Sequence, residues 1–278
     1  MNFYDIFKLI RLNISLLVVL SAFFGFIIAD EPFQLNLIYI LIAVLLHSFG
    51  NSIINQFQEQ NIDALMARTK NRPLITLRFD PKKTLIAGIF LLIVSILIPI
   101  LLGKYIISYI FVINIVIYHL IYTPLKKRSS FALLIGSICG SLPPIIGYFV
   151  AEDSLSVKIV FVAVLFYMWQ VPHFLFLTEK YKDDYENAKI RTLISEASKQ
   201  SYRMVASLWL ISYLCLLIMT ASILLKSLLL FLILIIIEII LILSIFGNLT
   251  RPVLKFNIIN LTIVLFIFFY LFERLYSI

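Results

Sequence analysis

Long apolar segments alternate with polar segments along the whole chain. Each apolar segment approaches the ~20 residues that a helix needs to cross the hydrocarbon core of a bilayer. Backbone groups in lipid must form hydrogen bonds within their own segment, so these segments are predicted to be helices rather than strands. The predicted spans cover residues 14–29, 35–54, 84–102, 106–122, 132–150, 157–177, 204–225, 228–246 and 256–271. The pattern therefore predicts an all-α polytopic membrane protein with nine transmembrane helices, forming a single domain over residues 1–278.

The composition supports a membrane protein over a soluble one. Hydrophobic residues make up 62% of the 278 residues and charged residues only 14%, whereas soluble domains carry about 25% charged residues. The net charge of +8 would suggest nucleic acid as a partner of a soluble chain. Here the basic residues lie in loops between apolar segments, so topology explains the charge, and we expect the lipid bilayer as partner and no nucleic acid.

The basic residues predict the orientation of the chain. Nearly all of the 23 Lys and Arg residues would fall on one side of the membrane, and the exceptions are Lys104, Lys158, Lys226 and Arg274. Positive charge collects on the cytoplasmic side, which predicts a cytoplasmic N-terminus in the inner (cytoplasmic) membrane of a cell. The two long loops, 55–83 and 179–203, would then be cytoplasmic, and long loops often carry function.

The first long loop opens with a polar cluster. Asn55, Glu59 and Asp63 are spaced four apart, so they would share one face if the second helix continues through them. An amide and two carboxylates supply the oxygen ligands that Mg²⁺ shares with substrate phosphates, and Arg68 and Arg72 follow as candidate phosphate contacts. The spacing alone is equally compatible with a solvated helix end.

The second polar cluster lies around the end of the sixth predicted helix. It contains Trp169, Gln170, Pro172, His173, Lys182, Asp183, Asp184 and Tyr185. His173 and Asp184 are eleven residues apart, about three helical turns, so they would share a face if the helix persists. Polar groups within a span are functional candidates by default, although a buried, hydrogen-bonded histidine is the alternative for His173.

Other polar residues in apolar segments receive weaker predictions. His47 and His119 are expected to be hydrogen-bonded core residues, although His47 and Asn51 would extend the four-residue spacing of the first cluster. Glu238 requires a partner or protonation, and no partner can be named. The basic triplet that starts at Lys126 is expected to be a topological anchor. The Gly and Pro residues of 136–147 would permit close helix approach and a broken helix.

Four blocks in this order resemble the UbiA superfamily of prenyltransferases, and most closely its branch that farnesylates protohaem. The first is Asn55…Asp63-Ala-Leu-Met-Ala-Arg68-Thr-Lys-Asn-Arg72-Pro-Leu; the second is Tyr122-Thr with Lys126 and the two basic residues after it. The third is the glycine- and proline-containing stretch 140–147, and the fourth is Trp169-Gln-Val-Pro-His173-Phe with Lys182-Asp-Asp-Tyr185. The resemblance fades in the last three predicted helices.

The resemblance implies a reaction. Mg²⁺-bound farnesyl diphosphate would ionise, a vinyl group of protohaem (haem B) would capture the allylic cation, and water would complete the product, haem O. The metal and cations would neutralise the leaving diphosphate, and a central apolar chamber would keep water from the cation. A downstream haem-modifying enzyme or terminal oxidase would use the product.

The resemblance also assigns roles to residues of this chain. Asn55, Glu59, Asp63, Asp183 and Asp184 would hold Mg²⁺, and Arg68, Arg72 and Lys126 would contact phosphate. The other expected substrate-binding residues are Trp169, Lys182 and Tyr185. His173 and Trp169 would face the acceptor, with haem ligation or orientation as the role of His173. The residues expected to be catalytic are Asn55, Asp63, His173 and Asp184.

The chain departs from the family pattern at three places. Glu59 stands where the family usually has aspartate, Asn61 stands where it usually has another acid, and residues 188–193 differ from the usual sequence. These departures leave open a family member that prenylates a quinone precursor or a lipid alcohol. A haem-binding membrane protein or a transporter without catalysis is the more distant alternative.

Overall fold

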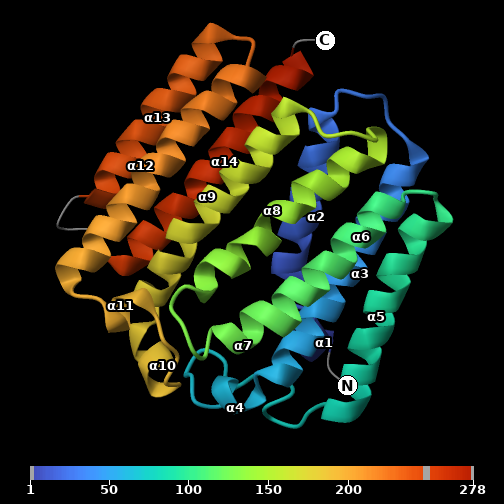
Figure 1. Cartoon of the computed structure of the whole chain (residues 1–278), viewed down its shortest axis with the longest axis vertical. Helices are drawn as coiled ribbons and strands as arrows, with labels where there is room; N and C mark the ends of the chain where they lie inside the picture. The colour runs from blue at the N-terminus through green and yellow to red at the C-terminus, as the bar shows by residue number, and fades with distance from the viewer. Residues whose placement is uncertain (1–2, 247–250, 277–278) are drawn as a thin grey trace. The chain divides into compact units, whose positions relative to one another are not determined.

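The computed structural model describes residues 3–246 and 251–276, and every regular element in these ranges is a helix (Figure 1). The chain divides into two compact units. Unit 1 comprises Met1–Leu155 and Asp183–Arg191, and unit 2 comprises Ser156–Lys182 and Thr192–Ile278. The second long loop therefore contributes to unit 1, although it follows the first helix of unit 2.

Unit 1 is built mainly from helices that cross the membrane. Its helices are α1 (Phe3–Leu9), α2 (Leu12–Ile28), α3 (Leu35–Gln58), α4 (Gln60–Asp63), α5 (Pro81–Leu101), α6 (Tyr105–Ile115), the π-helix η1 (Val116–Tyr122), α7 (Thr123–Leu125) and α8 (Ala132–Ala151). The helix α3 packs against α2 and α5, and α2 packs against α8. Apolar residues of these helices form the core, which includes Ala22, Ile40 and Phe111.

Unit 2 contains four long helices. They are α9 (Val157–Lys180), α12 (Lys199–Leu224), α13 (Leu228–Phe246) and α14 (Pro252–Tyr276), and a short helix, α11 (Leu193–Glu196), precedes α12. The helix α9 packs against α12 and α14, and α13 packs against both of these. The short helix α10 (Lys182–Asn187) lies where the chain passes from unit 2 into unit 1.

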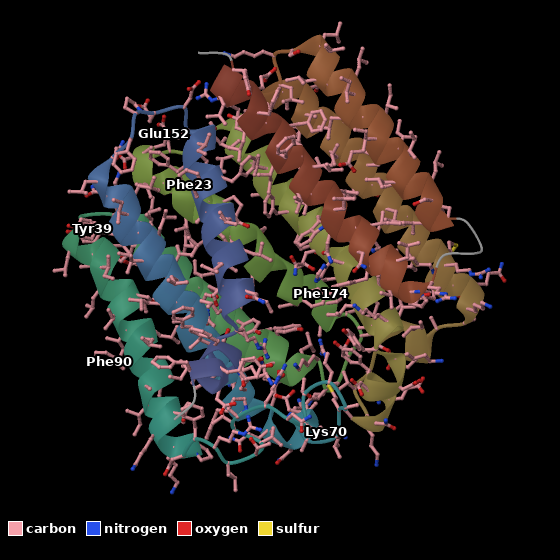
Figure 2. The ribbon with its side chains drawn as sticks, turned by 180° about the vertical axis from the view of Figure 1, so that it is seen from behind. Phe23, Tyr39, Lys70, Phe90, Glu152 and Phe174 are labelled. Atoms are coloured by element: carbon pink, nitrogen blue, oxygen red, sulfur yellow. The ribbon has the colours of Figure 1, made fainter. Side chains whose placement is uncertain are left out.

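The prediction of a polytopic all-helical membrane protein is confirmed. Within the described ranges, eight helices are long and apolar enough to cross a membrane, and a ninth span is reached if α1 and α2, which meet at a bend of 53°, count as one. Large apolar side chains such as Tyr39 and Phe90 point outward from this bundle (Figure 2), as expected of surfaces that contact lipid. The prediction of one domain over residues 1–278 is not tested by this division into units.

The contact between α2 and α8 is unusually close. A Cβ atom added at Gly25 would lie 1.8 Å from the carbonyl oxygen of Pro144, and one added at Gly147 would lie 1.6 Å from that of Ala22. Only glycine permits such an approach of two backbones. The predicted close approach is therefore present, but the predicted break is wrong, because α8 continues through Pro143 and Pro144 as one helix.

Candidate active site

The first polar cluster lies at the end of α3 and is buried. Asn55, Glu59 and Asp63 are 2%, 5% and 2% exposed, respectively. The helix does not continue unbroken, because Glu59 leaves the helical conformation with φ −107° and ψ 9°. The backbone N–H of Asp63 nevertheless donates to the Glu59 carbonyl at 2.8 Å, so the three residues keep nearly helical spacing. The Asn55 amide donates to Glu59 Oε1 at 2.7 Å.

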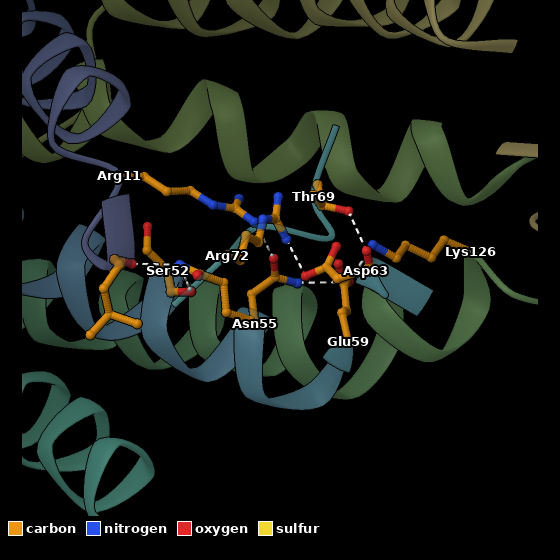
Figure 3. Close-up of polar contacts among 10 residues, drawn as sticks. Arg11, Ser52, Asn55, Glu59, Asp63, Thr69, Arg72 and Lys126 are labelled. Atoms are coloured by element: carbon orange, nitrogen blue, oxygen red, sulfur yellow. Dashed lines mark hydrogen bonds and ion pairs between the residues drawn. The ribbon is translucent and has the colours of Figure 1, made fainter. Parts of the chain in front are cut away.

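Three cations surround this cluster: Arg72 from the same loop, and Arg11 and Lys126 from distant parts of unit 1 (Figure 3). Arg72 pairs with Asp63, and Lys126 pairs with Glu59. Arg11 Nη2 donates to Asn55 Oδ1 at 3.0 Å. The cluster is therefore not a solvated helix end. Its carboxylates are buried, and the cations supply the compensating charge that buried carboxylates require.

Arg11 is a site residue that the sequence reasoning missed, since it was used only to assign topology. It stands at the bend between α1 and α2 in a left-handed conformation, with φ 48°. This conformation is uncommon for residues other than glycine, and it marks the place where the chain turns. A basic residue between a short helix and the first span was the only available signal.

The pKa values of the two carboxyls are shifted in opposite directions, although the ion pair at each carboxyl lowers its pKa. Burial by itself would raise the pKa of Glu59, but the Lys126 ammonium and other neighbours hold that pKa below its usual value. Burial raises the pKa of Asp63, and the Arg72 guanidinium offsets only part of this effect. Burial also lowers the pKa of Lys126 and, together with nearby Arg11, lowers that of Arg72 to about 10. Arg72 thus stays charged at neutral pH.

The second long loop reaches the first within unit 1. The Asp184 carboxylate accepts hydrogen bonds from the backbone N–H groups of Ala67 at 2.8 Å and Arg68 at 3.2 Å. The same two loops also share an apolar cluster, in which Ile62 and Met66 contact Ala188 and Ile190 and against which Tyr185 packs. Asp184 therefore holds the loop that carries the candidate phosphate-binding arginines.

The neighbours of Asp184 have different environments. Tyr185 is hydrogen-bonded to Arg68, so these two predicted substrate-binding residues are brought together in unit 1. Asp183 is exposed. Lys182, the other predicted contact in this segment, is exposed and belongs to unit 2.

The remaining predicted residues belong to α9 in unit 2. His173 Nδ1 lies 2.7 Å from Asn260 Oδ1, and Trp169 Nε1 donates to the carbonyl of Ile259 at 2.7 Å. The ring centroids of Trp169 and His173 are 4.9 Å apart, and those of Phe256 and His173 are 5.0 Å apart. Asn260 was missed, although it is one of two asparagines that the sequence shows in the apolar segment 256–271.

One geometric prediction for this region is wrong. His173 and Asp184 do not share a helix face, because α9 ends at Lys180 and Tyr181 adopts φ −116° and ψ 33°. The expectation that His47 and His119 are buried and hydrogen-bonded is confirmed. His47 contacts Ser95 and Asn114, whereas His119 contacts Asn51 at 2.9 Å and Gln58 at 2.9 Å.

The donor set at the end of α3 suits Mg²⁺ in its chemistry. Asn55, Glu59 and Asp63 offer only oxygen ligands, and Mg²⁺ commonly uses one or two carboxylates together with substrate phosphates and water. No group of three or more His, Cys, Asp or Glu residues placed to hold a metal occurs in residues 3–246 and 251–276. An amide and two carboxylates leave coordination positions of such a metal for phosphate oxygens and water.

Comparison with known proteins identifies the class. The sequence profile that describes the UbiA prenyltransferase family matches residues 18–272 and so covers helices of both units. The chain belongs to the UbiA prenyltransferase family, and it is a multi-pass membrane enzyme that transfers prenyl groups.

Three individual relatives carry the name of one particular prenyltransferase. The chain is 30% identical to the protoheme IX farnesyltransferase of Nitratidesulfovibrio vulgaris (strain DP4), over 78% of this chain and 76% of that protein. It is 32% identical to the protein of the same name from Orientia tsutsugamushi (strain Ikeda), over 73% of this chain and 66% of the relative. The corresponding protein of Aquifex aeolicus (strain VF5) is 37% identical over 55% and 53%, respectively.

Solved structures show the same fold at lower identity. A digeranylgeranylglyceryl phosphate synthase superposes with a TM-score of 0.77 at 15% identity, covering 98% of both chains. A UbiA homologue from Archaeoglobus fulgidus bound to GPP and Mg²⁺ superposes with a TM-score of 0.70 at 12% identity, covering 96% of this chain and 98% of that one.

Proposed function

We propose that this chain transfers a farnesyl group from farnesyl diphosphate to a vinyl group of protohaem (haem B), in a Mg²⁺-dependent reaction that forms haem O. The observation that carries the proposal is the buried cluster of Asn55, Glu59 and Asp63 with its three surrounding cations. The names of the relatives and the Mg²⁺ and GPP bound to the Archaeoglobus homologue support the choice of substrates and metal.

The donor would bind at the end of α3. Asn55, Glu59 and Asp63 would hold the metal, which supplies charge neutralisation at the leaving diphosphate. Arg72 and Lys126 now pair with the two carboxylates, and they would turn to the phosphate oxygens when the donor arrives. Arg68 and Tyr185 would contact the diphosphate beside them. Preorganised cations at a developing charge are a large source of catalysis.

The adjacent residues Asp183 and Asp184 would have different roles. Asp184 would chiefly position the arginine-bearing loop, because its carboxylate already accepts two backbone N–H groups. Asp183, which is exposed, would be available to the metal–diphosphate complex. An apolar chamber that shields the cation from water remains part of the proposal.

The acceptor would meet α9. With Nδ1 donating to Asn260 Oδ1, the other ring nitrogen of His173 keeps its lone pair. A histidine whose one ring nitrogen is fixed by a hydrogen bond is suited to ligate a metal through the other. His173 would therefore ligate or orient the haem iron, and Trp169 would pack beside the macrocycle. The predicted cytoplasmic orientation would place both long loops on the inner side of the cell membrane.

One departure from the family pattern is explained by the structure. Asn61 is exposed and lines a cavity with Phe57 and Asp80, whereas Glu59 and Asp63 are buried. An acid at position 61 would thus lie outside the buried cluster, so its absence does not argue against metal binding there. The family membership favours catalysis over a transporter or a haem-binding protein without activity.

Product formation tests the proposal. Purified protein is incubated with farnesyl diphosphate, protohaem and Mg²⁺, and farnesylated haem is sought by mass spectrometry. A parallel panel supplies a quinone precursor and a lipid alcohol as acceptors. Haem O formation is expected; prenylation of another acceptor alone, or no product from demonstrably folded protein, would reject the haem assignment.

The haem site has its own test. His173→Ala should reduce haem retained during purification, as measured by the Soret absorbance, whereas His119→Ala should not. His119 serves as the matched control because both of its ring nitrogens are already hydrogen-bonded within unit 1. Equal haem content in both variants would remove His173 from the acceptor site.

A further inference from the structure

A basic pocket in unit 1 lies outside the cluster of Asn55, Glu59 and Asp63. It has a volume of about 380 Å³ and is lined by Gln58, His119, Thr123, Pro124, Lys127 and Arg128. These residues come from the end of α3, from η1 and α7, and from the turn that follows. None of the residues assigned to metal or diphosphate lines it.

The basic triplet 126–128 divides between the two sites. Lys126 is paired with buried Glu59 at the candidate active site, whereas Lys127 and Arg128 are exposed and line the pocket. The chain forms a turn here, with the N–H of Arg128 donating to the Leu125 carbonyl at 2.8 Å. The interpretation of the triplet as a topological anchor therefore covers only part of its role.

The two outer cations have no bonded partner. No ion pair or hydrogen bond joins the side chain of Lys127 or Arg128 to any residue in the described ranges. The neutral lining groups are largely engaged. The Thr123 hydroxyl donates to the Tyr118 carbonyl at 2.8 Å, and Gln58 bonds to His119. The pocket thus presents uncompensated positive charge, which suits an anion.

The surroundings favour an anion that is attached to lipid. Leu120 precedes Pro124 by four residues, about one helical turn, and is 67% exposed. Phe131, shortly after Arg128, is 69% exposed. In a membrane protein such side chains contact acyl chains, and basic pockets next to spans bind anionic headgroups. Lys127 and Arg128 supply the charge-assisted donors that phosphate oxygens prefer.

We propose that this pocket binds the headgroup phosphate of an anionic phospholipid. Its position suggests what the lipid does. Gln58 directly precedes Glu59, and Lys127 directly follows Lys126, so a lipid bound there would hold together the two segments that form the Glu59–Lys126 pair. The lipid acts as a structural ligand of the active-site end of the unit and is distinct from both reaction substrates.

Lipid binding is measured on detergent-solubilised protein, without reaction substrates, by titrating phosphatidylglycerol and counting bound lipids by native mass spectrometry. Each cation near an anionic headgroup contributes about 1 kcal/mol, so Lys127→Gln/Arg128→Gln should weaken the tightest site about 30-fold. The matched control, Lys82→Gln/Lys83→Gln, removes two exposed charges from the same predicted side of the membrane. It should leave this site within about threefold of the unchanged protein, because charge outside the pocket acts only weakly through solvent.

Three results separate the alternatives. An equal loss of binding in both double variants would show general charge attraction and overturn the proposal. Displacement of phosphatidylglycerol by an equal concentration of inorganic phosphate would show a site for free anions and would also overturn it. Arg128→Lys, which keeps the charge, should retain binding; it and the single variant Lys127→Gln serve if the double variant fails to fold. Because no substrate is present, the result stands apart from the haem proposal.

Discussion

Two buried glutamates show how differently the two units accommodate an acid in a membrane protein. Glu59 in unit 1 is paired with Lys126 and accepts from Asn55. Glu238, on α13 of unit 2, is 0% exposed, and neither carboxyl oxygen has a hydrogen-bond partner among the described residues. A buried carboxylate without a partner carries a large desolvation cost. The buried glutamate of unit 1 is thus paired with a cation at the site where phosphate chemistry is proposed. The buried glutamate of unit 2 has no such pairing among the described residues.

The largest effect should come from the charged cluster itself. We expect Asp63→Asn to lower the rate of prenyl transfer at least ~100-fold, because it removes a carboxylate from the proposed metal site. The rate is measured with saturating donor and acceptor, and the melting temperature serves as a folding control. A near-normal rate in folded protein would separate the cluster from catalysis.

The ion pair itself can be broken from its cationic side. Lys126→Gln leaves the buried Glu59 carboxylate unpaired, which should cost about 3 kcal/mol of stability. Adding Glu59→Gln to that variant should restore much of the stability but not the activity, since the cation is still missing. Denaturant unfolding of both variants in the same detergent measures the difference. Additive losses would show that the two side chains do not act as a pair.

Lowering the pH should change the contributions of the two carboxyls to stability in opposite directions. The pKa of Glu59 is lowered in the folded protein, so its stabilising contribution is present above its ordinary value of 4.5 and is lost as pH falls through the folded pKa. The pKa of Asp63 is raised, so its contribution is present below 3.8 and is lost as pH rises through the folded pKa.

This sign difference predicts the behaviour of single variants. As pH falls below 4.5, Glu59→Gln should lose less stability than the unchanged protein, and Asp63→Asn should lose more. Melting temperatures of the three proteins across this range measure the effect. The reverse order would contradict the assigned pKa directions.

The smallest effect should come from unit 2. Glu238→Gln exchanges a carboxyl that lacks a partner for an amide of similar size, so the free energy of unfolding should change by less than ~1 kcal/mol. Glu238→Leu should be tolerated nearly as well. A loss comparable to that of Lys126→Gln would show that Glu238 has a role that its described neighbours do not reveal.

The apolar pattern was sufficient for the helices because lipid demands long, uninterrupted apolar segments. The predicted range 228–246 coincides with α13 over the residues that the structure describes. The π-helix η1 and the left-handed bend at Arg11 were not predictable, since both are local conformations stabilised by tertiary contacts. His119 on η1, for example, contacts two residues of α3.

The polar residues at the candidate site were largely visible, but their directions were not. The spacing of Asn55, Glu59 and Asp63 predicted a shared face, and the structure buries all three. Sequence spacing could not show that the Asp184 carboxylate accepts hydrogen bonds from the backbone of the first long loop. It also could not show that Lys126 pairs with Glu59 while its neighbour Lys127 lines a separate pocket.

The seam between α2 and α8 has a consequence for motion. Gly25 and Gly147 bring the two backbones together without side chains between them, so the seam has no rotamers that can rearrange and no gap into which one helix can slide. Any opening of unit 1 is therefore expected at less extensive contacts, such as those of α6 with α5 and α8. The seam would serve as a fixed spine, and α6 is a better place than α2 or α8 to attach a probe that reports such an opening.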